Sequence, residues 1–386
     1  MRIAMVIDPY DHPFNGTVVS TRRFIAALVA QGIAVRVLAI GSEDRGCPDA
    51  VERVDFPELR LPFVQPLIDR MRAPLARPVR ARVRSALEGC DLIHVQYPFF
   101  LGAVAIGEAR RLGIPVISSF HVQPENILRN LGLRGHWLVP LLYRLFRRGF
   151  FHRSDLVLAP SVYAAGLLKD EGVTTPMAVL SNGIPERFFA LRHAAVTAGV
   201  HDQTTFRVLS VGRLATEKDQ QTLIAAIAQS RFAARIELRL IGTGPRLETL
   251  ERLAQEAQVR AIIGPASDAA LEQALAGADL FVHCGRVELE GMSVLEAMAA
   301  GNAVLVAGSA DSACPAIVSD PLQQFPVGDA RALAERIDRW LADPRARAAQ
   351  GAGNRVLAAD YRHGGSVAQL LEHYRGLVAA AGGVAV

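Results

Sequence analysis

Short apolar runs recur along the first half of the chain, at a spacing typical of strands that alternate with helices. Each run is a few residues long, and the segments between the runs can form helices. The runs are Ile3–Ile7, Val35–Ile40, Leu92–Val95, Val116–Phe120 and Leu156–Leu158. Strands joined by helices pair in parallel, because each helix returns the chain to the same edge of the sheet. The pattern predicts an α/β domain with a doubly wound parallel sheet.

The same rhythm returns in the second half of the chain. Its apolar runs are Val208–Val211, Leu238–Ile241, Leu280–His283 and Ala303–Val306. A chain of 386 residues is long for one hydrophobic core and comfortable for two domains of roughly 180 residues each. We therefore predict two doubly wound halves, each of which binds ligands at the carboxyl ends of its strands.

The composition is typical of a soluble globular protein. Hydrophobic residues make up 51% of the chain and charged residues 21%, and no uninterrupted apolar run reaches the ~18 residues of a membrane span. The first apolar run is too short for a signal peptide, so we expect a cytoplasmic location. The cysteines have no metal-ligand spacing and are typical of reduced thiols; they are Cys47, Cys90, Cys284 and Cys314.

Positive charge is concentrated in the first half. Residues 1–185 contain 22 Lys and Arg against 16 Asp and Glu, whereas the whole chain has a net charge of +4. The segments Phe63–Arg84 and Trp137–Arg153 interleave arginines with large apolar residues. This mixture fits a helix on an anionic membrane surface, and equally a helix packed on the sheet with its arginines in solvent. No aromatic platform or recognition motif accompanies the charge, which disfavours a nucleic-acid partner.

Two carboxylates flank a predicted helix start in the second half. We expect the helix to begin at Gly291 or Met292 and to end at Gly301. Glu288 lies before this helix and Glu296 about one turn inside it. The backbone N–H groups at a helix start attract phosphate, and carboxylates accept hydrogen bonds from hydroxyl groups. The combination predicts a site for a phosphorylated sugar.

Two cations follow a predicted strand in the same half. Arg213 and Lys218 lie directly after the apolar run Phe206–Val211. Of the 42 Lys and Arg residues, only Lys169 and Lys218 are lysine, so a lysine at this position stands out. An ammonium is a compact charge and a guanidinium a planar fork, and a diphosphate can accept hydrogen bonds from one of each. A solvated surface pair is the alternative, but the strand-end position favours a diphosphate site.

Together these motifs resemble those of the retaining family 4 glycosyltransferases, and the resemblance extends over nearly the whole chain. Those enzymes have the GT-B fold, in which two Rossmann-like domains face a central cleft. The resemblance implies an N-terminal acceptor-binding domain (1–184), a nucleotide-sugar-binding domain (185–360) and a C-terminal helix (361–386) that crosses back to the first domain. The loop Ser181–Pro185 resembles the hinge between the two halves.

The resemblance also implies roles for individual residues. Glu288 and Glu296 match a Glu-x7-Glu pair that engages the donor sugar and the ribose. His121 belongs to a Phe-His pair that contacts the donor sugar or positions the acceptor, although a histidine that only closes a strand end is an alternative. The expected donor-binding residues are Gly16, Arg213, Lys218, Glu288, Gly291, Met292, Ser293 and Glu296. The expected catalytic residues are His121, Arg213, Lys218 and Glu288, and we place Glu125 and Asn126 on the acceptor side.

Two positions depart from the family pattern. The first loop has Asn15-Gly16-Thr17 where many relatives have adjacent glycines, and Glu290 stands where many have phenylalanine. Both changes alter the expected fit of the donor. Three other features are expected to be structural: the turn Gly242–Pro245, His94, and His283, which lacks companions for a metal site.

The expected reaction moves a hexose from a nucleoside-diphosphate sugar, with UDP-glucose favoured and GDP-sugars possible, to a membrane lipid such as diacylglycerol. No metal or other cofactor is expected, because the sequence lacks an Asp-x-Asp motif and the cations can take the place of magnesium. The enzyme is expected to lie at the inner face of the membrane. The alternatives are a saccharide acceptor, a sugar-nucleotide epimerase and a non-catalytic sugar-nucleotide binder.

Two cofactor enzymes that share this architecture are disfavoured. A nicotinamide dehydrogenase needs a Gly-x-Gly-x-x-Gly turn after the first strand, and the chain has Pro9–Pro13 there. A pyridoxal phosphate enzyme needs a Schiff-base lysine, and only Lys169 and Lys218 are available.

Overall fold

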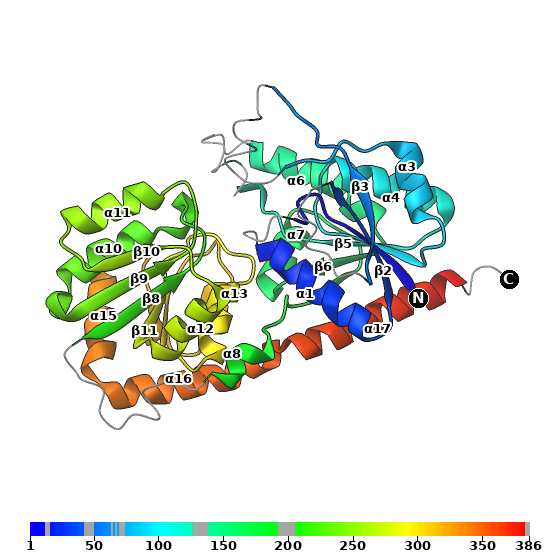
Figure 1. The fold of residues 1–386 in the computed structure, drawn as a ribbon. Helices are drawn as coiled ribbons and strands as arrows, with labels where there is room; N and C mark the ends of the chain where they lie inside the picture. Colours follow the sequence, from blue (N-terminus) through cyan, green and yellow to red (C-terminus); the bar gives the residue numbers. More distant parts are fainter. Residues whose placement is uncertain are drawn as a thin grey trace. The chain divides into compact units, whose positions relative to one another are not determined.

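The computed structural model divides the chain into two compact units (Figure 1). Unit 1 comprises Met1–Asn182 and Ser366–Val386, and unit 2 comprises Gly183–Gly365. The structure describes residues 1–11, 16–41, 50–62, 65, 68, 74–125, 128, 138–191 and 205–382. Each unit is built on a parallel sheet with helices in the connections, as the alternating pattern predicts.

The sheet of unit 1 has seven parallel strands in the order β3-β2-β1-β4-β5-β6-β7. The strands are β1 (Arg2–Val6), β2 (Ala34–Ile40), β3 (Glu52–Phe56), β4 (Leu92–Val95), β5 (Val116–Ser119), β6 (Leu156–Ala159) and β7 (Met177–Val179). All five predicted runs form strands. The edge strands β3 and β7 are missing from the prediction, because β3 contains three charged residues and β7 is only three residues long.

One face of this sheet packs against the first and last helices of the unit. Helix α17 (His363–Gly382) contributes Val367, Leu370, Leu371 and Tyr374, at the spacing of one helix face, to a core shared with α1 (Gly16–Ala30) and β1. The other helices of unit 1 whose bounds the described residues give are α3 (Arg80–Leu87), α4 (Phe100–Leu112), α6 (Leu138–Gly149), η1 (Phe151–Arg153) and α7 (Val162–Asp170).

The sheet of unit 2 has six parallel strands in the order β10-β9-β8-β11-β12-β13. They are β8 (Phe206–Val211), β9 (Ile236–Ile241), β10 (Ala261–Gly264), β11 (Leu280–His283), β12 (Val304–Ala307) and β13 (Gln324–Phe325). The four predicted runs form the four inner strands. The edge strands lack a clear apolar run, because β10 has no buried residue and β13 has only two residues.

Both faces of the unit 2 sheet are covered by helices. Successive residues of β11 point to opposite faces: Val282 packs with α10, α11 and α15, and Phe281 packs with α8, α12 and α13. The helices are α8 (Glu186–Ala190), η2 (Thr216–Lys218), α10 (Gln220–Gln229), η3 (Ala233–Arg235), α11 (Leu247–Glu256), α12 (Asp268–Gly277), α13 (Met292–Ala299), α14 (Cys314–Ile317), η4 (Pro321–Gln323), α15 (Ala330–Ala342), α16 (Pro344–Ala358) and η5 (Ala359–Tyr361).

The strand order reverses at the same place in both sheets. In unit 1, β1 lies between β2 and β4, and in unit 2, β8 lies between β9 and β11. Doubly wound sheets bind ligands outside the carboxyl ends of the strands at such a point, because the helices that follow leave on opposite faces. A ligand site is therefore expected at the ends of β1 and β4 in unit 1 and at the ends of β8 and β11 in unit 2.

Candidate functional site

In unit 2, Lys218 and Glu288 meet at the carboxyl edge of the sheet. Lys218 follows β8, Glu288 follows β11, and these strands are neighbours. The two side chains form an ion pair although 70 positions separate them in the sequence. The fold thus joins the cationic motif to the acidic motif at the point where the strand order reverses.

A neutral histidine lies beside this ion pair. His283 is the last residue of β11, and its Nε2 lies 3.1 Å from the Glu288 oxygen that Lys218 contacts. Burial lowers the pKa of Lys218 to about 8, against the opposing effect of Glu217. Burial and the charge of Lys218 lower the pKa of His283 to about 3, so its ring is neutral. The carboxylate of Glu288 therefore pairs with an ammonium and lies beside an imidazole whose Nε2 makes no hydrogen bond among the described residues. Its oxygen lone pairs can accept hydrogen bonds from hydroxyl groups.

Arg213 is fixed within the loop that follows β8. Its guanidinium donates to Glu217, whose side chain is buried, and its carbonyl oxygen accepts from Gln220 Nε2 at 2.9 Å. The Arg213 side chain stays 33% exposed, which leaves part of the guanidinium accessible to an anion. The two predicted cations are therefore both held by carboxylates, and Arg213 is the more accessible of the two.

The glycine turn after β9 supports this loop from one side. A Cβ atom on Gly242 would lie 2.0 Å from the carbonyl oxygen of Gly212, and one on Gly244 would lie 2.3 Å from that of Leu214. Backbone hydrogen bonds join the two loops, with Leu214 N donating to Thr243 O at 2.9 Å. These glycines allow two backbones to meet, which is the structural role expected for this turn.

Arg286 and Asp219 are site neighbours that the sequence analysis missed. Arg286 donates from Nε and NH2 to one oxygen of Asp219, at 3.0 and 2.8 Å, and its backbone N–H donates to Glu217 O at 2.8 Å. Asp219 is 2% exposed on its side chain and has a left-handed backbone with φ 48°. This pair of a buried carboxylate and a partly exposed guanidinium ties the loop after β8 to the loop after β11.

Helix α13 begins at Met292, as predicted. Gly291 precedes it with φ 86°, and a Cβ atom there would lie 2.6 Å from Cys314 Sγ, so conformation and space both require glycine. Met292 and Ser293 are partly buried in the first turn, and Glu296 is buried one turn further on. Val294 N already donates to Gly291 O at 2.9 Å, so the N–H groups of Met292 and Ser293 are the first-turn donors that fit an anion site.

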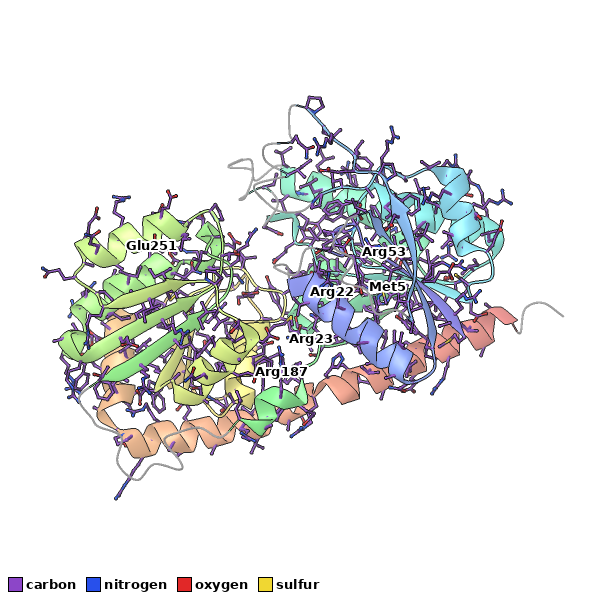
Figure 2. All side chains as sticks on the ribbon, in the orientation of Figure 1. Met5, Arg22, Arg23, Arg53, Arg187 and Glu251 are labelled. Atoms are coloured by element: carbon purple, nitrogen blue, oxygen red, sulfur yellow. The ribbon has the colours of Figure 1, made fainter. Side chains whose placement is uncertain are left out.

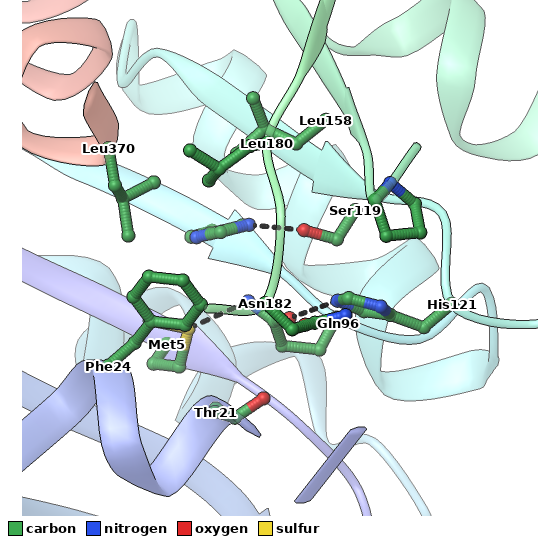
Figure 3. Close-up of a pocket in the computed structure, with 12 residues that line it drawn as sticks. Met5, Thr21, Phe24, Gln96, Ser119, His121, Leu158, Leu180, Asn182 and Leu370 are labelled. Carbon is green, nitrogen blue, oxygen red and sulfur yellow. Dashed lines mark hydrogen bonds between the residues drawn. The ribbon is translucent and has the colours of Figure 1, made fainter. Parts of the chain in front are cut away.

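In unit 1, His121 lies beside a small cavity at the carboxyl edge of the sheet. The cavity has a volume of about 20 Å³, enough for about one water molecule, and residues from β1, α1 and α17 help to line it (Figure 3). His121 Nε2 lies 3.0 Å from Gln96 Oε1, and Gln96 Nε2 lies 3.0 Å from Met5 Sδ. Burial lowers the pKa of His121 to about 4.

His94 is a structural histidine that helps to line the same cavity. Its Nδ1 lies 2.7 Å from the Tyr374 hydroxyl, and its Nε2 lies 2.7 Å from Ser119 Oγ. Burial, with a smaller contribution from His121, lowers the pKa of His94 to about 3. Because both ring nitrogens have protein partners, His94 has no nitrogen left for a ligand.

The remaining predicted residues of unit 1 are less constrained. Gly16 is the exposed first residue of α1, and no atom lies within 4 Å of the position where a Cβ would stand, so packing does not require glycine there. Glu125 accepts a hydrogen bond of 3.2 Å from the Tyr143 hydroxyl. Asn126 lies outside the described residues.

Models of known protein families match both units. The Glycosyltransferase Family 4 model matches residues 14–188, and the model of Glycosyl transferases group 1 matches residues 196–356. The chain belongs to the group 1, family 4 glycosyltransferases. It is therefore an enzyme that transfers a sugar from a nucleotide-sugar donor.

Similar proteins support the same assignment. The chain is 29% identical over 326 residues to the alpha-monoglucosyldiacylglycerol synthase of Streptococcus pneumoniae, covering 80% of this chain and 71% of the relative. It is 29% identical over 313 residues to a GDP-mannose-dependent alpha-mannosyltransferase of Corynebacterium glutamicum, covering 78% and 71%. The structure of a sucrose-phosphate synthase from Thermosynechococcus elongatus superposes with a TM-score of 0.78 at 20% identity, covering 98% of this chain and all of the other. That structure shares the GT-B fold.

The two basic segments of this glycosyltransferase differ. In the first, residues 74–79 are not helical and α3 begins only at Arg80, because Pro74 and Pro78 interrupt a helix. A continuous surface helix over this segment is therefore wrong. The second forms α6, on which Leu141 and Leu145 are 44% and 56% exposed.

Part of the positive charge in unit 1 is internal. The Arg53 side chain, labelled in Figure 2, is 5% exposed. It pairs with Asp11 and Asp55, and its guanidinium carbon lies 5.5 Å from the centre of the Tyr10 ring. Arg53 therefore belongs to the interior of unit 1 and adds nothing to a basic surface. None of the described helices has the length and apolarity needed to cross a membrane.

Proposed function

We propose that this glycosyltransferase moves glucose from UDP-glucose, with retention of configuration and without a metal ion, to a hydroxyl group of a membrane lipid such as diacylglycerol. The observation that carries the donor part is the contact of Lys218 with Glu288 where the strand order of unit 2 reverses. A cation for the diphosphate and a carboxylate for the sugar hydroxyls are thereby held side by side.

The charge of the leaving group accounts for the cations. The bond between the sugar C1 and the phosphate oxygen breaks, and its electron pair goes to the nucleoside diphosphate. Lys218, Arg213 and the N–H groups at the start of α13 are proposed to stabilise this charge in place of a metal. The acceptor oxygen then bonds to C1 from the same face, and its proton passes to the leaving phosphate.

The carboxylates of unit 2 are proposed to orient the donor. Glu288 accepts hydrogen bonds from the hexose hydroxyls, and Glu296 accepts them from the ribose. Gly291, Met292 and Ser293 present backbone N–H groups to the phosphates. In unit 1, His121 is proposed to form a hydrogen bond with a substrate hydroxyl group. Gly16 is proposed to let a ligand approach the backbone closely, and Glu125 to line the acceptor side of the site.

A lipid acceptor is supported by the surface of α6. The exposed leucines Leu141 and Leu145 alternate with the exposed arginines Arg144 and Arg148 on this helix. Leucines enter the boundary of the acyl chains while arginines contact anionic headgroups, so this face fits an anionic bilayer. The streptococcal relative is also named for a glucosyl diacylglycerol product.

GDP-mannose is the second candidate donor, because the corynebacterial relative is named for it at the same identity. Calorimetric titration of the full chain with UDP-glucose, GDP-mannose, UDP and GDP, in the presence of a chelator, separates the candidates. We expect saturable binding of the uridine nucleotides only. Binding of the guanosine nucleotides instead would make GDP-mannose the donor in place of UDP-glucose. Binding that appears only after magnesium is restored would contradict metal independence.

Transfer is then measured on diacylglycerol in anionic liposomes and in neutral liposomes. We expect glucosyl diacylglycerol, formed faster on the anionic vesicles. Activity on soluble sugars but not on liposomes would overturn the lipid acceptor and leave the donor assignment intact.

The role of Glu288 is tested with Glu288→Gln, which keeps the shape and removes the charge. We expect nucleotide affinity to stay within a few fold, while kcat falls by about 10² because the sugar is no longer held in a reactive orientation. Loss of UDP binding itself would mean that Glu288 serves the nucleotide and not the hexose.

A further inference from the structure

The side chain of His121 is held by hydrogen bonds that lead to a sulfur atom in β1. In Figure 3 the dashed lines run from His121 to Gln96 and from Gln96 to Met5, at 3.0 Å each. Gln96 is 4% exposed and Met5 is 1% exposed, so bulk solvent does not reach the second contact. The backbone N–H of Gln96 also donates to Val6 O at 2.9 Å, which fixes the base of its side chain.

The chemistry of these groups determines where each proton lies. A thioether sulfur has no hydrogen and only accepts, so the amide of Gln96 must turn its NH2 group toward Met5. Its carbonyl oxygen then faces His121, and this oxygen also only accepts. The ring of His121 must therefore donate from Nε2, and a neutral imidazole carries a single N–H.

We propose that Met5 and Gln96 are positioning residues that hold His121 in the tautomer with its proton on Nε2, so that Nδ1 accepts a hydrogen bond from a substrate hydroxyl. The identity of that hydroxyl rests on the proposed transferase function, whereas the tautomer does not. His94 does not compete for these contacts, because its nitrogens bond to Tyr374 and Ser119.

The basicity of His121 limits what Nδ1 does. With a pKa of about 4 the ring is neutral at pH 7 and is a weak proton acceptor. Efficient general bases have a pKa near the working pH, so His121 orients a hydroxyl and leaves proton removal to the departing phosphate.

The tautomer is read directly by NMR of the full chain labelled with 15N-histidine. Long-range proton–nitrogen correlations distinguish a protonated ring nitrogen from one with a lone pair, and the His121 signals are assigned by their loss in His121→Ala. We expect a neutral ring with the proton on Nε2. A proton on Nδ1, or an even mixture of the two forms, would overturn the proposal.

Three variants separate positioning from general disturbance of the cavity. Gln96→Leu removes the acceptor and is expected to populate both tautomers of His121. Met5→Leu conserves volume, frees the amide of Gln96 to turn over, and is expected to give a partial mixture. Ser119→Ala alters the partner of His94 and is the matched control, in which His121 should keep its tautomer. If Gln96→Leu does not fold, Met5→Leu alone decides, and an unchanged tautomer in it would overturn the role of the sulfur.

Kinetics then connect the tautomer to transfer. Gln96→Leu is expected to lower kcat about tenfold, the scale of one misdirected hydrogen bond, with the Kd of UDP unchanged. An unchanged kcat would show that the tautomer is set but not used. If the wild-type chain holds the predicted tautomer but transfers no sugar, the proposed function fails and the positioning inference stands.

Discussion

The two units have the same strand order at their carboxyl edges and fill that place with opposite chemistry. In unit 1, His121 is neutral and hydrogen-bonded to Gln96, and His94 is neutral and hydrogen-bonded to Tyr374 and Ser119. In unit 2, Lys218 and Glu288 form an ion pair. The position of a ligand site is thus a property of the fold, whereas the class of ligand depends on a few side chains at the strand ends.

Burial reinforces the difference. His94 is 3% exposed and loses little by staying neutral, because a buried neutral group needs only hydrogen-bond partners. A buried charge costs much more, so unit 2 pairs Lys218 with a carboxylate and leaves both side chains 17% exposed. A neutral edge suits hydroxyl groups, and a charged, accessible edge suits a diphosphate.

The largest expected effect comes from removing the charge of unit 2. Lys218→Ala should lower kcat/KM by at least ~10²-fold, on the scale of one preorganised charge contact, and Arg213→Ala should do the same. Initial rates with UDP-glucose and circular dichroism of each variant measure activity and fold together.

A matched control sharpens this comparison. Arg252→Ala removes a cation of the same unit whose side chain is 64% exposed and pairs with the exposed Glu256, and we expect an activity within twofold of the wild type. Near-normal turnover in both site variants would remove the cationic mechanism. Equal losses in all three variants would point to net charge instead of position.

The central parts of both sheets could be predicted from the sequence, because buried parallel strands are continuous apolar runs. The runs at Leu92–Val95 and Leu280–His283 match β4 and β11 residue for residue. Edge strands could not be predicted in the same way. The charged β3 is stabilised by internal ion pairs of Arg53, a contact that no local pattern contains.

The candidate site could be predicted as separate motifs but not as an assembly. The helix start at Met292 and the position of Lys218 after β8 follow from local signals. The contact of Lys218 with Glu288 depends on β8 and β11 being neighbours. His283 was expected to be structural because the sequence offered no metal partners for it, and its proximity to Glu288 exists only in three dimensions.

The loss of the Lys218 charge at high pH is expected to have an effect of intermediate size on nucleotide binding. Its pKa is lowered to about 8, so the ammonium that a diphosphate needs is present below pH 8 and lost above it. We expect the Kd of UDP to rise by up to about tenfold per pH unit above pH 8, and binding near that pH to take up a proton. Calorimetry in two buffers of different ionisation enthalpy measures the proton uptake.

Lys218→Arg tests whether this pH dependence belongs to Lys218. A guanidinium stays charged over the whole range, so the rise in Kd above pH 8 should disappear even if the affinity at pH 7 is lower. A pH dependence that persists in Lys218→Arg would assign it to another group.

The smallest expected effect lies in the neutral network of unit 1. Tyr374→Phe removes the hydroxyl that bonds to His94 Nδ1 and leaves that buried nitrogen without its partner, at a cost of about 1–3 kcal/mol. Native-state hydrogen exchange reads the loss locally, as faster exchange of amides in α17 and β4. Tyr361→Phe is the control, because Tyr361 is only partly buried and belongs to unit 2, and we expect no change in the exchange of α17.

Adding Ser119→Ala to Tyr374→Phe completes a double-mutant cycle through His94. We expect the two losses of stability not to add, because both hydrogen bonds end on the same imidazole and are therefore coupled. Additive losses would show that the two hydrogen bonds are independent.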